Sequence, residues 1–252
     1  MDNGCCNVKN MNSYIEKSFK LLKNIGDNSQ KTLFFEIGIR DIYPGQFFML
    51  NYFGQKPISV SHYDGNIVGF TVQNRGKCTE RMVNANIGDY FGLTGPLGNK
   101  FFTDDVDKIL IIGGGIGIAP LYFLAKKLIR DGKNIDIYFG ARTKTFFEFT
   151  FDIKDRVNYF TDDGTFGRKG FVTESLTLLN KNYDLLCLCG PENMMKKAFD
   201  IAKNSIKSIE LSLERYMKCG IGICGSCVLD NIGVRVCSEG PVFRIENGEW
   251  IV

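Results

Sequence analysis

The chain has a single histidine, His62, and this scarcity restricts its chemistry. One imidazole is too few for a Rieske cluster or for a Cys2His2 zinc site, each of which needs two. It also leaves little scope for acid-base catalysis by histidine. We expect His62 itself to lie in a loop.

Membrane, secretion and nucleic-acid signals are also lacking. No apolar run is long enough to cross a bilayer, and no charged segment followed by an apolar one opens the chain. The net charge of +3 is small and scattered, so we expect no nucleic acid and no membrane as partner. The nine cysteines are an odd number, which argues against a secreted disulfide framework. A reducing compartment, the cytoplasm, is the predicted location.

Cysteine is plentiful, and four cysteines cluster near the carboxyl end. Their order is C-x4-C-x2-C with a fourth further on, the plant-type spacing that holds a [2Fe-2S] cluster in thiolates. The predicted cluster ligands are Cys219, Cys224, Cys227 and Cys237. Structural zinc is the main alternative, although zinc sites usually pair two CxxC units and this motif has one. Unligated thiols are a further alternative.

Glycines separate these cysteines. Gly220, Gly222 and Gly225 can adopt positive φ and let the backbone wrap closely around a cluster. We expect amide N–H groups of such a loop to point at sulfur, which would adjust the reduction potential. The other paired cysteines, Cys5 and Cys6, lie in a polar amino-terminal stretch, and we assign them no function.

The organisation of the chain changes near residue 100. Residues 19–97 form short β-rich runs between turns, which predicts a small antiparallel barrel or sandwich. From residue 107 a buried strand, a glycine turn, a helix and a second strand follow one another, and this alternation predicts a parallel sheet. A further strand over 183–190 is expected to precede a helix that begins near Glu192. The cysteine segment follows as an appendage from about residue 212.

A glycine-rich turn lies where the first strand of the parallel half meets its helix. Backbone N–H groups and a helix dipole at such a point can receive a pyrophosphate. The sequence Gly113-Gly114-Gly115-Ile116-Gly117 is neither the G-x-G-x-x-G fingerprint nor a P-loop, and tight packing alone would also favour glycine there. Residues 189–191 end another strand on the same carboxyl edge, where open α/β sheets bind ligands. Cys187 is expected to be a buried small residue.

Taken together, the motifs resemble the ferredoxin-NADP reductase superfamily. Within it they resemble the iron-sulfur and FAD electron-transfer subunits of class 1B dihydroorotate dehydrogenase. The similarity covers nearly the whole chain, and its most diagnostic part is the ending around the cysteines. The motifs are PGQF at 44–47, KPISV at 56–60, residues 76–79, GPLGN at 95–99, GGGIGIAP at 113–120, TDDGTFGRKG at 161–170, CGPENM at 189–194, ERYMKCGIGICGSC at 214–227 and VCSEGPVF at 236–243.

The resemblance implies which residues hold each cofactor. FAD would be bound by the barrel through Lys56, Pro57, Ile58, Ser59, Gly76 and Thr79. Lys56 departs from the arginine that is usual in the family, and an ammonium group cannot make the same forked contact. NAD would be bound through Gly113, Gly115, Gly117, Asp163 and Cys189, with Asp162 also near a ribose. Local capping of the turn is an equally good explanation for both aspartates.

The family also implies the architecture and the partner. The expected domains are a flexible terminus (1–11), an antiparallel FAD-binding barrel (12–100), a parallel-sheet NAD-binding α/β domain (101–210) and a [2Fe-2S] domain (211–252). Such a chain would be an NAD-dependent oxidoreductase subunit in pyrimidine biosynthesis. It would exchange electrons with an FMN-containing catalytic subunit that oxidises dihydroorotate, in a dimer of heterodimers.

Two other interpretations stay open at this point. Flavin and iron-sulfur subunits of bifurcating transhydrogenases and of sulfhydrogenases share the same domains. Cys219 argues against the bifurcating subunit, whose motif has aspartate as its first ligand. A protein of a different class, a non-enzymatic iron-sulfur redox sensor, would lack turnover with NADH and a dye.

Overall fold

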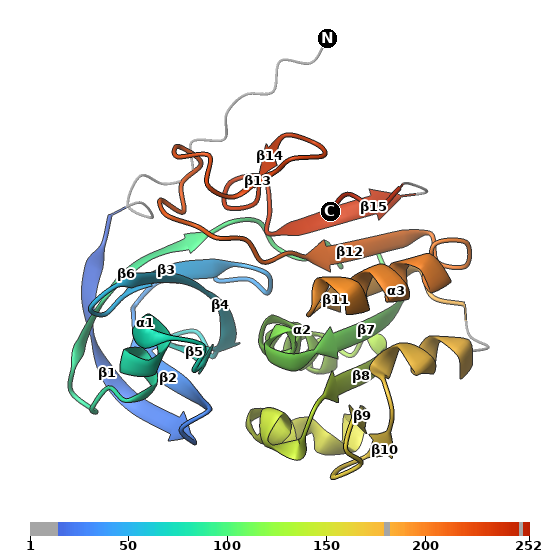
Figure 1. The fold of residues 1–252 in the computed structure, drawn as a ribbon, viewed down its shortest axis with the longest axis horizontal. Helices are drawn as coiled ribbons and strands as arrows, with labels where there is room; N and C mark the ends of the chain where they lie inside the picture. The colour runs from blue at the N-terminus through green and yellow to red at the C-terminus, as the bar shows by residue number, and fades with distance from the viewer. Residues whose placement is uncertain (1–14, 179–181, 247–248) are drawn as a thin grey trace.

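A computed structural model describes residues 15–178, 182–246 and 249–252. The chain forms a closed antiparallel barrel, a seven-stranded sheet flanked by helices, and a small two-stranded hairpin (Figure 1). The predicted fold class, a barrel followed by a parallel-sheet α/β domain, is confirmed. Cys5 and Cys6, and the predicted flexible terminus over 1–11, lie outside the described residues.

The barrel forms because its strands carry many apolar side chains, which close around a core. Aromatic rings fill this core: Phe35, Phe48, Phe70 and Phe91 are fully buried and contact one another edge-on or at a tilt. The order around the barrel is β1-β2-β5-β4-β3-β6, and β6 closes it by pairing with β1. Its elements are β1 (Lys17–Gly26), β2 (Gln30–Glu36), β3 (Phe47–Asn51), β4 (Gln55–Tyr63), β5 (Ile67–Gln73), the short helix α1 (Lys77–Val83) and β6 (Tyr90–Leu97).

The second sheet has the order β10-β9-β8-β7-β11-β12-β15, and all its neighbours are parallel except β12 and β15. Its central strands β7 and β11 are nearly continuous apolar runs, as expected for strands covered on both faces. The elements are β7 (Lys108–Gly114), the 3-10 turn η2 (Gly115–Gly117), α2 (Ile118–Arg130), β8 (Asn134–Ala141), η3 (Lys144–Arg156), β9 (Val157–Thr161), β10 (Arg168–Lys169), η4 (Val172–Leu178), β11 (Leu185–Cys189), α3 (Glu192–Ala202), β12 (Ser208–Ser212) and β15 (Val242–Glu246).

The cysteine segment leaves the sheet at β12 and returns to it at β15. Between these strands lies the hairpin of β13 (Val228–Leu229) and β14 (Val234–Arg235), drawn above the barrel in Figure 1. β15 pairs with β12 in antiparallel register from Ser208↔Glu246 to Ser212↔Val242. The segment is therefore anchored to the NAD-domain sheet at both ends. The predicted domain boundary at residue 211 stays a prediction.

The expectation that His62 lies in a loop is wrong. His62 belongs to β4, and its ring packs against Phe34 and against Tyr122 of α2. A bulge between Val60 and His62 breaks the alternation of β4, which hid this strand position in the sequence. The contact with Tyr122 places His62 between the barrel and the α/β domain.

Candidate functional site

A cavity of about 440 Å³ lies where the barrel, the start of α2 and the cysteine segment meet. The barrel contributes the first half of β4, the end of β5 and the start of α1 to its walls. All the residues predicted to bind FAD line this cavity, namely Lys56, Pro57, Ile58, Ser59, Gly76 and Thr79. The structure thus brings together two motifs that are separated in the sequence, although their roles stay predictions.

The lining of this cavity suits an amphipathic group that carries phosphates. Pro57, Ile58 and Pro120 supply apolar surface, and Ser59 supplies a hydroxyl. Arg75 adds a permanent positive charge, and its side chain is held by a 2.6 Å bond from Nε to Gln73. Hydroxyl and cationic donors of this kind are those that phosphate requires. The residues present therefore fit FAD.

Two of the predicted FAD residues, Lys56 and Thr79, make contacts that their sequence motifs do not indicate. The Lys56 ammonium lies 5.8 Å from the ring centroid of Tyr216, a cation–π distance. The Thr79 hydroxyl accepts hydrogen bonds from the backbone N–H groups of Arg75 and Gly76, and it donates to the Gly76 carbonyl. Thr79 therefore fixes the turn that precedes α1, which shapes the cavity wall.

Two further cavities, of about 270 and 650 Å³, lie at the carboxyl edge of the parallel sheet. Both are lined by Gly114, Gly115 and Pro191, and both share Arg75 with the barrel-side cavity. Gly115 has a φ of +54°, and a Cβ there would meet nothing within 4 Å, so its free space faces the cavities. The predicted pyrophosphate turn therefore borders open space at the edge where α/β sheets bind ligands.

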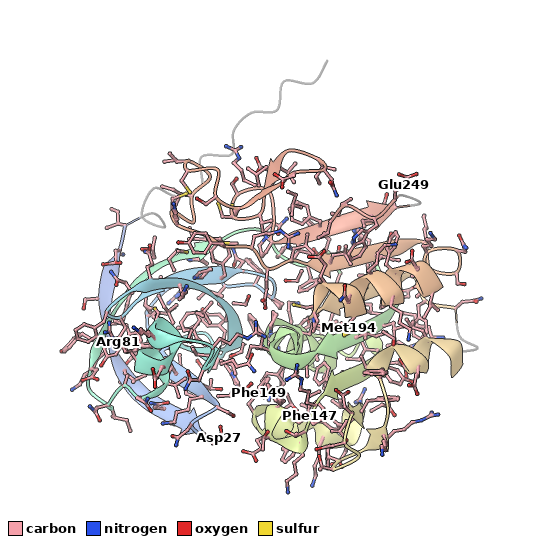
Figure 2. The ribbon with its side chains drawn as sticks, viewed as in Figure 1. Asp27, Arg81, Phe147, Phe149, Met194 and Glu249 are labelled. Carbon is pink, nitrogen blue, oxygen red and sulfur yellow. The ribbon has the colours of Figure 1, made fainter. Side chains whose placement is uncertain are left out.

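The glycines of this turn have different surroundings. Gly117 lines the smaller cavity, whereas Gly113 lines none of the three and packs against Ile118 and Leu121. Met194, labelled at the start of α3 in Figure 2, lies so close to Gly114 that a Cβ there would meet its sulfur at 2.4 Å. Close packing accounts for Gly113, for Gly114, which also lines both cavities, and for Gly117, whereas the open space beside the turn belongs to Gly115.

The two aspartates of the TDDG turn are directed differently. Asp162 lines the 650 Å³ cavity together with Arg142. Asp163 instead accepts hydrogen bonds from the backbone N–H and the hydroxyl of Thr165, at 2.9 and 2.7 Å. The Thr165 hydroxyl and N–H lower the pKa of Asp163. Turn capping thus explains Asp163, and Asp162 is the aspartate that faces a ligand space.

Cys189, predicted to lie near the nicotinamide, is buried at the end of β11 and lines none of the three cavities. Burial raises the pKa of its thiol, so the group is uncharged at neutral pH. Its neighbour Gly190 lines the 270 Å³ cavity. Cys187 is also fully buried, as expected.

The cysteine loop places its thiols by backbone hydrogen bonds. Gly220, Gly222 and Gly225 have φ values of 70°, 82° and 70°, which confirms the predicted positive-φ loop. The N–H of Gly222 donates to the sulfur of Cys237 at 3.2 Å. The N–H of Cys237 in turn donates to the sulfur of Cys227 at 3.4 Å. Amide groups are therefore directed at sulfur, as the glycine spacing predicts.

The four thiols lie in two neighbouring pairs, Cys219 beside Cys224 and Cys227 beside Cys237. Cys224 is exposed, and its hydrogen bonds with Ser226, first with the hydroxyl and then with the backbone, lower the pKa of Cys224 to about 6. Burial raises the pKa of Cys237 to about 12. Across the described ranges, no three Cys, His, Asp or Glu side chains converge on a point for one metal ion. Two pairs of soft thiolates fit a two-iron cluster.

Three cavity residues carry chemistry that the sequence did not single out. Arg75 directly precedes the predicted Gly76, and an arginine next to a predicted phosphate-binding motif is a sequence signal for a phosphate contact. Thr71 of β5 lines the barrel-side cavity and is nearly buried, but a threonine within a strand gives no signal. Tyr216 belongs to the diagnostic ERYMKC motif and lines the same cavity.

Comparison with protein-family models identifies two domains. Residues 214–247 match the iron-sulfur cluster binding domain of dihydroorotate dehydrogenase B, and residues 111–200 match an oxidoreductase NAD-binding domain. The predicted iron-sulfur and NAD cofactors are confirmed by these domain matches.

Curated relatives cover most of the chain. One from Archaeoglobus fulgidus, a probable electron transfer subunit of dihydroorotate dehydrogenase B (NAD(+)), is 40% identical over 222 residues, covering 87% of this chain and 93% of that protein. The chain belongs to the family of dihydroorotate dehydrogenase B electron transfer subunits. The electron transfer subunit from Clostridium perfringens is 38% identical over 212 residues, which are 81% of this chain and 85% of that protein. The predicted resemblance and the predicted class, an NAD-dependent oxidoreductase subunit, are confirmed.

Solved structures agree with this family. An NADH-dependent reduced ferredoxin-NADP oxidoreductase, studied for flavin-based electron bifurcation, has a TM-score of 0.79 and 29% identity over 90% of this chain and 87% of that chain. Phthalate dioxygenase reductase has a TM-score of 0.68 at 14% identity over 84% of this chain and 85% of that chain, and it shares the fold. Within the ranges that the structure describes, none of the helices combines the length and apolar character needed to span a bilayer.

Proposed function

We propose that this chain passes electrons between NAD and a separate catalytic subunit that oxidises dihydroorotate, by way of FAD and a [2Fe-2S] cluster. One observation carries the proposal: the segment that leads into the cysteine loop lines the same cavity as the predicted FAD residues. Leu213, Tyr216 and Met217 contribute to that wall. Flavin in the cavity would therefore lie beside the cluster loop.

Close packing between the cysteine loop and the barrel supports this arrangement. A Cβ on Gly220 would lie 2.7 Å from the Met49 side chain and 3.1 Å from Leu97, so the loop rests directly on β3 and β6. The glycine at this position allows the close approach.

The residues of this chain would bind and orient the cofactors. Bound FAD would interconvert the hydride of a nicotinamide and the single electrons that an iron-sulfur cluster carries. Pro57, Ile58 and Ser59 would hold the flavin ring, and Arg75 would neutralise phosphate charge where the cavities meet. The glycine turn at 113–117 would orient the nicotinamide nucleotide, and the buried thiol of Cys189 would remain neutral behind it.

The partner is part of the proposal. The name "electron transfer subunit" of the curated relatives implies a catalytic subunit. We infer an FMN-containing dihydroorotate dehydrogenase subunit and a dimer of heterodimers. We assign no dihydroorotate site to this chain, because its predicted motifs are committed to FAD, NAD and the cluster.

The second candidate function is a subunit of a bifurcating transhydrogenase. It is favoured by the 29% identity and TM-score of 0.79 with the NADH-dependent reduced ferredoxin-NADP oxidoreductase. Cys219 in the first ligand position and the identities of about 40% to dihydroorotate dehydrogenase subunits favour the first proposal.

Steady-state kinetics on the chain alone, followed by kinetics with the co-purifying partner, test the proposal. We expect the isolated chain to contain FAD and to reduce an artificial acceptor with NADH in preference to NADPH. Orotate should form only when the partner is present. FMN in place of FAD, a higher kcat/KM for NADPH, or orotate formed without a partner would contradict it.

A further inference from the structure

A line of buried hydroxyl groups leads away from the barrel-side cavity. Thr71 of β5 lines the cavity and is 3% exposed. Its hydroxyl donates to Ser61 Oγ at 2.8 Å, and Ser61 Oγ lies 3.1 Å from Nδ1 of His62. The line ends at His62, which keeps part of its surface exposed although burial of its side chain lowers its pKa.

A bulge in β4 creates this line. Val60 pairs with Phe70 and His62 pairs with Gly69, which leaves Ser61 as an extra residue between them. Bulges redirect side chains, and here Ser61 Oγ also bonds the Gly69 carbonyl at 3.1 Å. A Cβ on Gly69 would lie 2.9 Å from the His62 Cβ, so only glycine lets the imidazole approach β5 this closely.

The far end of the line meets the α/β domain. The His62 ring lies 4.7 Å from the ring of Tyr122, whose hydroxyl donates to Asp152 at 2.8 Å. Asp152 also pairs with Lys126, and both side chains are 46% exposed. Burial lowers the pKa of His62 to about 4, the charge of Asp152 raises it and that of Lys126 lowers it. The imidazole is therefore neutral at neutral pH, with one nitrogen that donates and one that accepts.

We propose that Thr71, Ser61 and His62 form a proton path between the flavin cavity and solvent. This rests on the proposed function, and it follows from the balance of that reaction. A flavin that takes two electrons from a one-electron carrier and passes a hydride to NAD+ must also take one proton from water. In that direction the proton would enter at His62, cross the two hydroxyls and end on the flavin. In the reverse direction it would leave by the same groups.

Each proton that crosses the path changes the state of His62. Inward transfer requires both hydroxyls to turn from the arrangement above, so that Ser61 donates to Thr71 and Thr71 donates to the flavin. Transfer then removes the proton of Nδ1, while Nε2 gains one from water, so the imidazole changes tautomer and Ser61 then donates to Nδ1. Rotation of the hydroxyls and the ring restores the starting arrangement. Ser61 and His62 are positioning residues here, and Thr71 is the group that would touch the flavin.

The test separates the two half-reactions of the FAD-loaded chain in anaerobic stopped flow. Reduction by NADH delivers a hydride and draws no proton from water, whereas reduction by reduced methyl viologen, a one-electron donor, does. In Ser61→Ala we expect the viologen reaction to slow by about tenfold or more and to change its solvent isotope effect and pH profile. The NADH reaction should stay within about twofold.

Thr32→Val is the matched control. Thr32 is a buried threonine that pairs with Thr71 at 3.0 Å, but it lies on the side away from His62. This variant should leave both half-reactions within about twofold. The path would be overturned if the viologen reaction slowed equally in Ser61→Ala and Thr32→Val. It would also be overturned if Ser61→Ala slowed both half-reactions equally, or slowed neither.

A measurement that does not depend on turnover is needed in case a variant loses FAD. Because His62 is the only histidine, 15N-histidine NMR reports its tautomer without assignment. We expect Ser61→Ala to shift the tautomer population of His62, because Nδ1 loses the hydroxyl that lies 3.1 Å away, and an unchanged population would overturn the path. A chain that binds no flavin would instead contradict the proposed function, so the two failures are distinguishable.

Discussion

Gly117 and Gly190 pack backbone to backbone: a Cβ built on Gly117 would lie 2.5 Å from the backbone nitrogen of Gly190. Gly117 begins the helix after β7, and Gly190 follows β11, so the two strand-to-helix turns at the carboxyl edge touch. Only residues without side chains allow this contact. The contact sets the shape of the 270 Å³ cavity that both glycines line.

We expect Gly117→Ala to separate these turns. Overpacking against backbone atoms should lower the free energy of unfolding by about 1–3 kcal/mol and weaken NADH binding. Urea unfolding and NADH titration would measure the two effects. Gly113→Ala is the control in the same motif, because its Cβ would meet only side chains, at 3.1 Å and beyond. A loss no greater than that of Gly113→Ala would contradict the contact.

Replacement of Cys224 by serine should remove the cluster and leave FAD bound. The wild-type chain, purified anaerobically, should contain the two irons and two acid-labile sulfides of a [2Fe-2S] centre. Metal and sulfide analysis with flavin quantification would measure both. Cys78→Ser is the control for iron alone, since this cysteine lies outside the motif, although it lines the barrel-side cavity. One zinc and no sulfide in the wild type would rule out the cluster.

Ser59 and Thr79 should affect FAD in different ways. Loss of the free Ser59 hydroxyl in Ser59→Ala should cost about 0.5–1.5 kcal/mol of binding, or about 2- to 12-fold in Kd, with the flavin-free protein as stable as before. Thr79→Val should destabilise the flavin-free protein as well, because its hydroxyl fixes the backbone before α1. Flavin titration and thermal unfolding of both apoproteins would measure this, and equal behaviour of the two would contradict it.

Glu210 should make the protein less stable as pH rises toward neutrality. It is fully buried in β12, accepts from the Phe102 N–H and pairs with Arg244 at 2.8 Å. Burial raises its pKa to about 7, and Arg244 and Phe102 offset this only in part. The folded state therefore keeps a proton that the unfolded chain releases near its ordinary value of 4.5. Its contribution to stability is present below about pH 4.5 and is lost as pH rises to about 7.

Glu210→Gln, which cannot titrate, should remove that part of the pH dependence. Urea unfolding between about pH 4.5 and 7.5 would show a wild-type minus variant difference that declines with pH. Glu246→Gln is the control, because Glu246 also faces Arg244 but is 56% exposed and 3.7 Å away. A flat difference for Glu210→Gln would show that Glu210 is ionised throughout.

Local signals predicted much of the site. The spacing of the cysteines and of their glycines depends only on local backbone geometry, so the positive-φ loop could be anticipated. Residues 56–59 and 76–79, two motifs that were recognised in the sequence, also line one cavity. Such signals are local, so they can be recognised without knowledge of the fold.

Other features depend on contacts between distant segments. Asp162 and Asp163 are equivalent in the sequence, and only the Thr165 contact shows that one caps the turn while the other faces a cavity. β15 looks like any short apolar run until its register with β12 is known. His62 was misplaced because a bulge breaks the alternation of β4.

The pairing of β12 with β15 closes the cysteine segment at its base before any iron arrives. Pairing of the two strands brings residues 213 and 241 together, and the entropy cost of closing the segment between them is met when the sheet forms. Binding of a cluster therefore has to order only the residues inside this segment. Iron loss should therefore melt a local unit while the sheet stays folded. A repair system could then rebuild the cluster on a chain that never unfolds.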